Sequence, residues 1–121
     1  MTEGRTRRGS NQPRLTLIFW RDIPAQVKAK SGRSRVSAPL SDRFMIAVDA
    51  AATKAGKTST DDYIAEWREE GRPCGEDLQS EVDEAVRLVE AAYPPDLIKT
   101  YVRNEGWAPG REPGDSASES P

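Results

Sequence analysis

A short string near the start of the chain contains the residues best suited to chemistry. It runs from Trp20 to Val27 and reads WRDIPAQV. Arg21 offers a planar fork of N–H donors that suits a carboxylate or a phosphate, and the carboxyl group of Asp22 could serve as a general acid or base. The same residue types also build structural corners, in which Asp22 caps a turn and Arg21 pairs locally or covers the ring of Trp20. The string therefore predicts either an anion site or a structural corner.

Basic residues follow this string at the spacing of a strand. Lys28 and Lys30 are two residues apart, which places both on one face of a strand, and Arg33, Arg35 and Arg43 come next along the chain. Such a series can bind phosphate groups or an acidic protein surface. Stacking aromatic residues do not alternate with these charges, and the sequence has no glycine-rich phosphate loop. The same charges can also protect an exposed hairpin from edge-to-edge aggregation without any ligand. A protein is the expected partner, and nucleic acid is the weaker alternative.

The composition lacks most catalytic equipment. The 121 residues include no His and a single Cys, Cys74. The absence of His removes the commonest general base, the commonest zinc ligand and any Ser-His-Asp or Cys-His pair. The acids between Glu66 and Glu90 follow neither the Glu-x-x-His pattern of di-iron proteins nor the spacing of a calcium loop, so they are expected to cover a solvated helix face. We therefore expect a protein that is not an enzyme and that holds no metal and no cofactor.

Charge is divided unevenly along the chain. Residues 1–57 contain 12 Lys and Arg against 4 Asp and Glu, whereas residues 58–121 contain 6 against 16. The resulting net charge of −2 is atypical of a protein whose whole surface binds nucleic acid. The division instead predicts a dipolar molecule or two halves that attract each other. The two signs of charge either mark solvated faces alone or provide a basic face that a partner uses.

Composition also predicts one folded domain between two disordered tails. Residues 1–14 are rich in Arg and residues 108–121 in Pro, Gly, Ser and acids, so neither segment can bury enough apolar surface to fold. Residues 15–107 are enough for a single domain. No apolar run approaches the ~18 residues of a membrane helix, and the first segment lacks the apolar core of a secretory signal. We therefore expect a cytoplasmic protein without membrane contact.

Periodicity predicts strands first and helices afterwards. Residues 15–20 are apolar on both faces, as in a central strand covered on two sides, and residues 25–38 alternate around a Ser-Gly-Arg-Ser turn, as in a β-hairpin. Helical spacing, caps and glycine stops predict helices over residues 41–56, 59–71, 76–92 and 96–106. The expected fold is α+β. A small antiparallel sheet of about three strands (residues 15–38) is packed on one face by three to four helices (residues 41–105).

Two longer strings resemble one bacterial family, the virulence-factor domain. They are FWRDIPAQV at residues 19–27 and PLSDRFMIAVDAAATKAGKTSTDDYIAEWR at residues 39–68. The resemblance implies a short stand-alone protein or terminal module, with no catalytic residues to assign. It also implies an association with folate- and corrinoid-linked one-carbon metabolism, and hence an accessory subunit of a methyl-transfer enzyme. The matching polar residues are candidates for a shared surface: Arg21, Asp22, Gln26, Arg43, Glu66 and Arg68.

These observations lead to a hypothesis of a non-catalytic accessory protein that binds another protein. Its contact surface would be the hairpin together with the corner from Trp20 to Gln26. The alternative is a small anionic-ligand-binding protein or enzyme, in which Arg21 holds a phosphate or folate tail and Asp22 or Glu66 acts as acid or base. The predicted binding residues are Trp20, Arg21, Asp22, Gln26, Lys28, Lys30, Arg43, Glu66 and Arg68.

Overall fold

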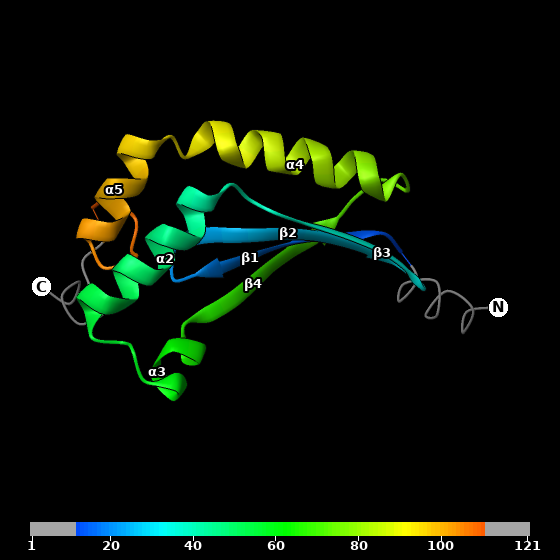
Figure 1. Ribbon diagram of the computed structural model, residues 1–121. Helices are drawn as coiled ribbons and strands as arrows, with labels where there is room; N and C mark the ends of the chain where they lie inside the picture. Colours follow the sequence, from blue (N-terminus) through cyan, green and yellow to red (C-terminus); the bar gives the residue numbers. More distant parts are fainter. Residues whose placement is uncertain (1–11, 111–121) are drawn as a thin grey trace, which may run out of the picture.

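The computed structural model describes residues 12–110 as four strands and four helices (Figure 1). The strands are β1 (Arg14–Trp20), β2 (Ile23–Ser31), β3 (Ser34–Pro39) and β4 (Trp67–Pro73). The helices are α2 (Asp42–Ala55), α3 (Thr60–Ala65), α4 (Leu78–Ala92) and α5 (Pro95–Arg103). The α+β class is therefore confirmed. No helix among the described residues has both the length and the apolar character to cross a membrane.

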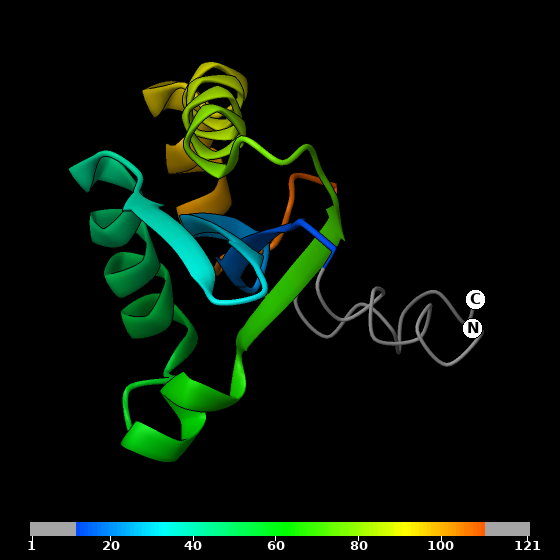
Figure 2. The ribbon, with the colours of Figure 1, turned by 90° about the vertical axis from the view of Figure 1, so that its right-hand side faces the viewer.

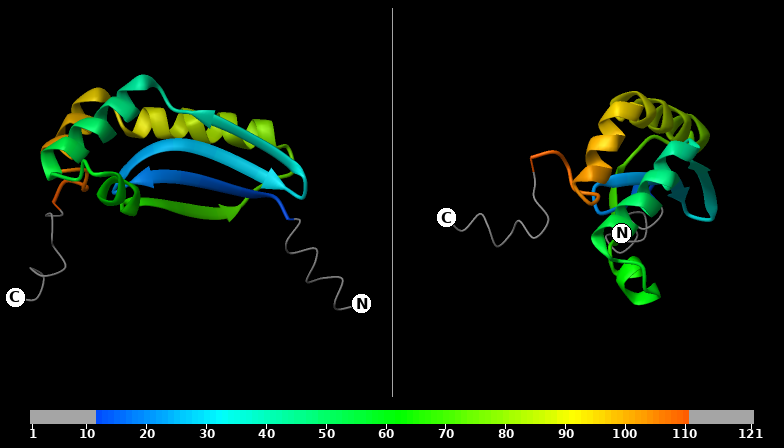
Figure 3. Two further views of the ribbon diagram at one scale, coloured as in Figure 1. Left: turned by 60° about the horizontal axis from the view of Figure 1, so that its bottom comes forward. Right: turned by 60° about the vertical axis from the view of Figure 1, so that its left-hand side comes forward.

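The four strands form one antiparallel sheet in the order β3-β2-β1-β4. Helices α4 and α2 pack against β2 from one side, and α5 packs on α2 (Figure 2). The opposite face of the sheet carries none of these helices, as the left view of Figure 3 shows with α4 behind the strands. The molecule thus has a helical layer and an open sheet face.

The core lies between the sheet and the helical layer. Leu15 and Val27 project from the two central strands, and Phe44, Val48 and Val82 come from α2 and α4; all five side chains are fully buried. Alternation along a strand sends every second side chain to this face, and the spacing of three and four residues does the same on the helices. The sequence patterns of residues 15–38, 42–55 and 78–92 therefore account for the main core.

The fourth strand corrects the predicted second helix. That helix was expected to run to Gly71, but α3 ends at Ala65 and the chain continues as β4. β4 pairs with β1 along its whole length, from Trp20 opposite Trp67 to Arg14 opposite Pro73. This pairing satisfies backbone groups that β1 would otherwise leave unpaired. The free energy gained from the pairing is larger than the local preference for helix.

A second correction concerns the strand at residues 15–20. It is central in the sheet, as predicted, but it is not covered on both sides. Thr16 and Ile18 line a hollow on the open face and are only partly buried. Most of the two predicted tails lies outside the described residues. The innermost residues of these tails lie within the described part of the chain. Arg14 begins β1, and the Ala108 N–H donates a hydrogen bond to Asp22.

Candidate functional site

The predicted site residues lie in three separate places. Five of them form a group at the end of the sheet, which we call the corner cluster: Trp20, Arg21 and Asp22, which are buried, and Glu66 and Arg68, which are partly exposed. Gln26, Lys28 and Lys30 lie on the open sheet face. Arg43 lies on the helical layer, at the start of α2. The hairpin and the corner therefore do not form one continuous accessible surface.

The corner cluster is built on the tight turn between β1 and β2. Arg21 has a φ of 55°, a left-handed conformation that is unfavourable by about 1 kcal/mol for a residue with a side chain. Its N–H donates to the carbonyl of Glu66 at 3.1 Å, and the Asp22 N–H donates to the carbonyl of Gly106 at 2.8 Å. Segments distant in sequence thus hold this strained turn from two sides.

The Arg21 side chain is sandwiched between two indole rings. Its guanidinium carbon lies 5.2 Å from the ring centroid of Trp20 and 4.9 Å from that of Trp107. Nη1 donates to the carbonyl of Glu105 at 2.9 Å, and Nε lies 3.4 Å from Oε1 of Glu66. Because Arg21 is only 6% exposed and already has these contacts, an added anion would have to displace protein groups.

Asp22 is held just as firmly. Its Oδ1 accepts a hydrogen bond from Nη2 of Arg68 at 3.0 Å, and its Oδ2 accepts one from the Ala108 N–H at 2.8 Å. Arg68 also donates through Nε to the carbonyl of Arg21 at 2.8 Å and lies over the ring of Phe19. Both oxygens of the Asp22 carboxyl group are therefore engaged by other protein groups, as in a structural corner.

Trp20 completes the corner from inside the core. Its side chain is fully buried, its Nε1–H donates to the carbonyl of Tyr63 at 2.9 Å, and the two rings stack with centroids 6.0 Å apart. The corner cluster therefore joins the β1–β2 turn to the α3–β4 junction and to the segment after α5. These contacts favour the structural interpretation of the WRDIPAQV string.

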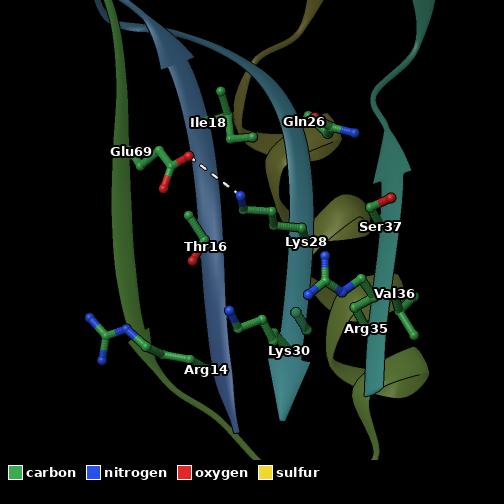
Figure 4. Close-up of a pocket in the computed structure, with 11 residues that line it drawn as sticks. Arg14, Thr16, Ile18, Gln26, Lys28, Lys30, Arg35, Val36, Ser37 and Glu69 are labelled. Atoms are coloured by element: carbon green, nitrogen blue, oxygen red, sulfur yellow. Dashed lines mark hydrogen bonds and ion pairs between the residues drawn. The ribbon is translucent and has the colours of Figure 1, made fainter. Parts of the chain in front are cut away.

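The open sheet face presents a different arrangement, which we call the basic hollow (Figure 4). It has a volume of about 460 Å³, and its lining residues are Arg14, Thr16, Ile18, Gln26, Lys28, Ala29, Lys30, Arg35, Val36, Ser37 and Glu69. All four strands contribute. Glu69 is the single acid among these residues, and its Oε2 lies 3.4 Å from Nζ of Lys28.

Three cations of the basic hollow form a row across the sheet. Lys30 is paired with Arg14 on one side and with Arg35 on the other, and all three side chains are exposed. Residues directly opposite in antiparallel strands have Cβ atoms about 5 Å apart, so like charges there are destabilising. Within residues 12–110, no carboxylate forms an ion pair with any of the three. The fold thus keeps an unfavourable row of charges at an open surface.

Arg43 has a separate role in the helical layer. Its Nη1 forms an ion pair with Oε1 of Glu90 at 3.0 Å, and its Nη2 donates to the carbonyls of Glu90 and Tyr93 at 2.8 and 3.0 Å. It therefore links the start of α2 to the end of α4.

Several groups outside these clusters have raised pKa values, and Tyr93 and Cys74 are two of them. Burial, reinforced by the neighbouring Tyr101, raises the pKa of Tyr93 to about 12. Burial and the carboxylate of Glu81 also raise the pKa of the Cys74 thiol. Both groups therefore stay protonated at neutral pH and supply neither a general base nor a thiolate nucleophile. Among the described residues, no three His, Cys, Asp or Glu side chains lie close enough together to hold a metal ion.

Comparison with protein families confirms the family to which the resemblance pointed. A profile for the family described as virulence factor matches residues 18–102, well over half of the chain. The chain belongs to the virulence factor family. No curated protein and no solved structure matches it. The residues matched by the virulence factor profile include the whole corner cluster and Lys28, Lys30 and Arg35, but not Arg14 or the segment from Glu105 to Ala108.

The sequence analysis did not identify several residues of the corner cluster and the basic hollow. Arg14 was assigned to the N-terminal tail, although it lies two residues before Thr16 and extends the same strand alternation. That spacing could have placed it on the open face. Glu105 and Ala108 gave no comparable signal, because their contacts with Arg21 and Asp22 join positions more than eighty residues apart.

Proposed function

We propose that this virulence factor family member is a non-catalytic accessory protein that binds an acidic protein surface in the basic hollow. The row of Arg14, Lys30 and Arg35 is the observation that supports this proposal. A row of like charges without carboxylate partners lowers stability, so its presence is best explained by a ligand that supplies the missing negative charge. Lys28 and Gln26 extend the same surface.

The chemistry of the lining favours a protein over a nucleic acid. The lining residues include no aromatic side chain on which a base could stack, whereas single-strand binders depend on such stacking. Thr16, Gln26 and Ser37 offer polar groups that can bond to carboxylates and backbone groups. A small polyanion is the second candidate, because a concave hollow of about 460 Å³ could enclose a phosphate-rich or carboxylate-rich molecule.

In this proposal the corner cluster positions the binding surface. Trp20, Arg21, Asp22, Glu66 and Arg68 hold β1, β2 and β4 together at one end of the sheet, and so set the spacing of the strands that carry the cations. Binding is assigned to the hollow alone. The partner proposed from the family resemblance is a methyl-transfer enzyme of folate- or corrinoid-linked one-carbon metabolism.

A charge-reversal experiment tests the proposed surface. The tagged full chain, its Lys30→Glu variant and an Arg33→Glu control are each used to capture proteins from extracts of the native host at low and moderate salt. Arg33 lies in the β2–β3 turn and does not line the hollow, so the two variants differ in place but not in net charge. One stoichiometric partner that is lost with Lys30→Glu and kept with Arg33→Glu would support the proposal.

Purified probes then separate the ligand classes. Binding of a labelled Glu-rich peptide, a labelled single-stranded oligonucleotide and tripolyphosphate is compared with the same three proteins. Preference for the peptide supports a protein partner. Tighter binding of the oligonucleotide, with a steep loss at higher salt, would replace the proposal with nucleic-acid binding. A response to tripolyphosphate alone would favour a small anion, and equal binding by both variants would reject the hollow as the site.

A further inference from the structure

The helical layer contains an apolar groove that the basic hollow does not involve. It lies between α2 and α5, which run side by side at one end of the molecule (Figures 1 and 3). Its volume is about 440 Å³, and most of its lining is apolar. Ile46, Ala47 and Ala50 come from α2, and Pro95, Ile98 and Val102 from α5. The two helices thus present matching apolar stripes.

The length of these stripes fits a short helical ligand. On α2 the lining residues begin at Arg43 and continue at positions i+3, i+4 and i+7; on α5 they begin at Pro95 and follow the same spacing. Seven residues of helix rise about 10 Å. Two parallel ridges of that length form a trough for the apolar face of about two helical turns, the geometry in which amphipathic helices bind grooves.

The exposure of one side chain shows that the trough is open. Ile46 is 66% exposed and its neighbour on the same helix, Met45, is 40% exposed. Leaving most of an isoleucine in water forgoes the hydrophobic stabilisation that burial provides. An apolar partner that covered Ile46 would recover it.

The rim of the groove has a single sign of charge. Arg43, Lys99 and Arg103 line it together with the apolar residues, and no acid among residues 12–110 does. Arg43 already pairs with Glu90, whereas Lys99 and Arg103 have no ion pair to a carboxylate within residues 12–110. Acidic residues flanking the apolar face of a ligand would complement this rim.

A second copy of this chain matches the groove poorly. The acidic helix α4 is its best internal candidate, but Leu88 is the one large apolar side chain that α4 exposes. A groove two turns long has room for apolar side chains at i, i+3 and i+7. From the open stripes and the cationic rim, we infer that the α2–α5 groove binds an acidic amphipathic helix of another protein.

A titration of the full chain tests this inference. The probe is a synthetic helical peptide with Leu at positions i, i+3 and i+7 and Glu at the flanking positions, and a scrambled peptide of equal composition is the control. Followed by NMR, the peptide is expected to shift amide signals of α2 and α5, while those of the basic hollow stay in place. The scrambled peptide is expected to shift none.

Matched variants give the expected magnitudes. Ile46→Ser should weaken peptide binding by about tenfold or more, because it removes one buried apolar contact, and Lys99→Glu should weaken it by about threefold or more through charge repulsion. Ile64→Ser and Arg87→Glu change equally exposed residues on α3 and α4 and should stay within about twofold. These variants leave the cations of the basic hollow intact. The experiment therefore distinguishes a failure of the groove inference from a failure of the proposed function.

Four outcomes would overturn the inference. Equal binding of the scrambled peptide would show that the groove does not distinguish an amphipathic helix from a peptide of the same composition. Shifts confined to the sheet face would place the peptide in the basic hollow. Binding of laurate without binding of the peptide would assign the groove to a single alkyl chain, and a concentration-dependent dimer that protects Ile46 in sedimentation and exchange experiments would assign it to a second copy.

Discussion

The corner cluster and the basic hollow use the same kinds of charged residues in opposite ways. In the corner, Arg21 and Asp22 are less than 9% exposed and contact carboxylates, carbonyls, N–H groups and aromatic rings. In the hollow, Arg14, Lys30 and Arg35 face solvent beside one another. β1 and β4 contribute residues to both regions, so burial and partners distinguish the two regions rather than residue type.

This difference has an energetic reason. A buried charge is strongly unfavourable unless it is paired and hydrogen-bonded, so the corner is stable only because distant segments supply partners. An exposed charge retains its hydration, and the row in the hollow persists at a modest cost in stability. Changes in the corner should therefore lower stability, whereas changes in the hollow should alter binding and leave stability nearly unchanged or higher.

Trp20→Ala is expected to have the largest effect. Removing a fully buried indole leaves a cavity beside Tyr63 and Arg21, and truncations of this kind lower the free energy of unfolding by about 4 kcal/mol. Urea unfolding followed by circular dichroism measures the loss. Leu88→Ala, at an exposed site on α4, should change stability by about 0.5 kcal/mol or less. Similar losses in the two variants would contradict a packed corner.

Gly106→Ala comes next, because it affects both the backbone and the space behind the corner. Gly106 has a φ of +95°, and an added Cβ would lie 3.0 Å from Cζ3 of Trp20 and 3.2 Å from Cδ of Arg21. We expect a loss of about 2–3 kcal/mol from strain and overpacking together. Gly56→Ala is the matched control, with a φ of +75° and open space around the added methyl group, and should lose only about 1 kcal/mol. Thermal unfolding of the pair separates strain from crowding.

Two substitutions of Arg21 separate the contribution of its side-chain contacts to stability from the cost of its left-handed backbone. Arg21→Ala and Arg21→Gly both remove the guanidinium contacts, but only glycine adopts a φ of 55° without strain. The glycine variant should therefore be more stable than the alanine variant by about 1 kcal/mol, and both should be less stable than the wild type. Equal stabilities, measured by urea unfolding, would show that the left-handed turn carries no strain.

The smallest effect is expected in the hollow, and with the opposite sign. Lys30→Glu places an acid between Arg14 and Arg35 and should raise stability by about 0.5 kcal/mol, as expected for exposed cross-strand charge pairs. The gain should shrink at high salt. The same variant should lose partner binding. A loss of stability in differential scanning calorimetry would show that the row of cations is not unfavourable.

Much of the fold follows from short-range patterns. The hairpin of β2 and β3 turns around Gly32, whose φ is positive, as the Ser-Gly-Arg-Ser string predicts. α2 ends at Gly56 in a left-handed cap, as the glycine stop predicts, and the Ser59 side chain caps the start of α3 by accepting a bond from the Asp62 N–H. These signals act within a few residues, so the sequence alone reveals them.

The candidate sites follow less directly. Lys28 and Lys30 were predicted to share a face, and the structure places both in the hollow. The row that carries the proposed function depends on the register between strands, which pairs Lys30 with residues on both neighbours. The corner depends on partners far along the chain, so the sequence left the WRDIPAQV string open to two interpretations.

The sequence by itself determined the family, the α+β class, the glycine end of α2 and the residues able to carry charge to a surface. Only the tertiary structure decided that residues 67–73 form an edge strand, that Arg21 and Asp22 are buried, and that Arg14, Lys30 and Arg35 lie in one row. Local backbone preferences and periodicity act over a few residues. Strand pairing and the burial of charge depend on segments that meet only when the chain folds.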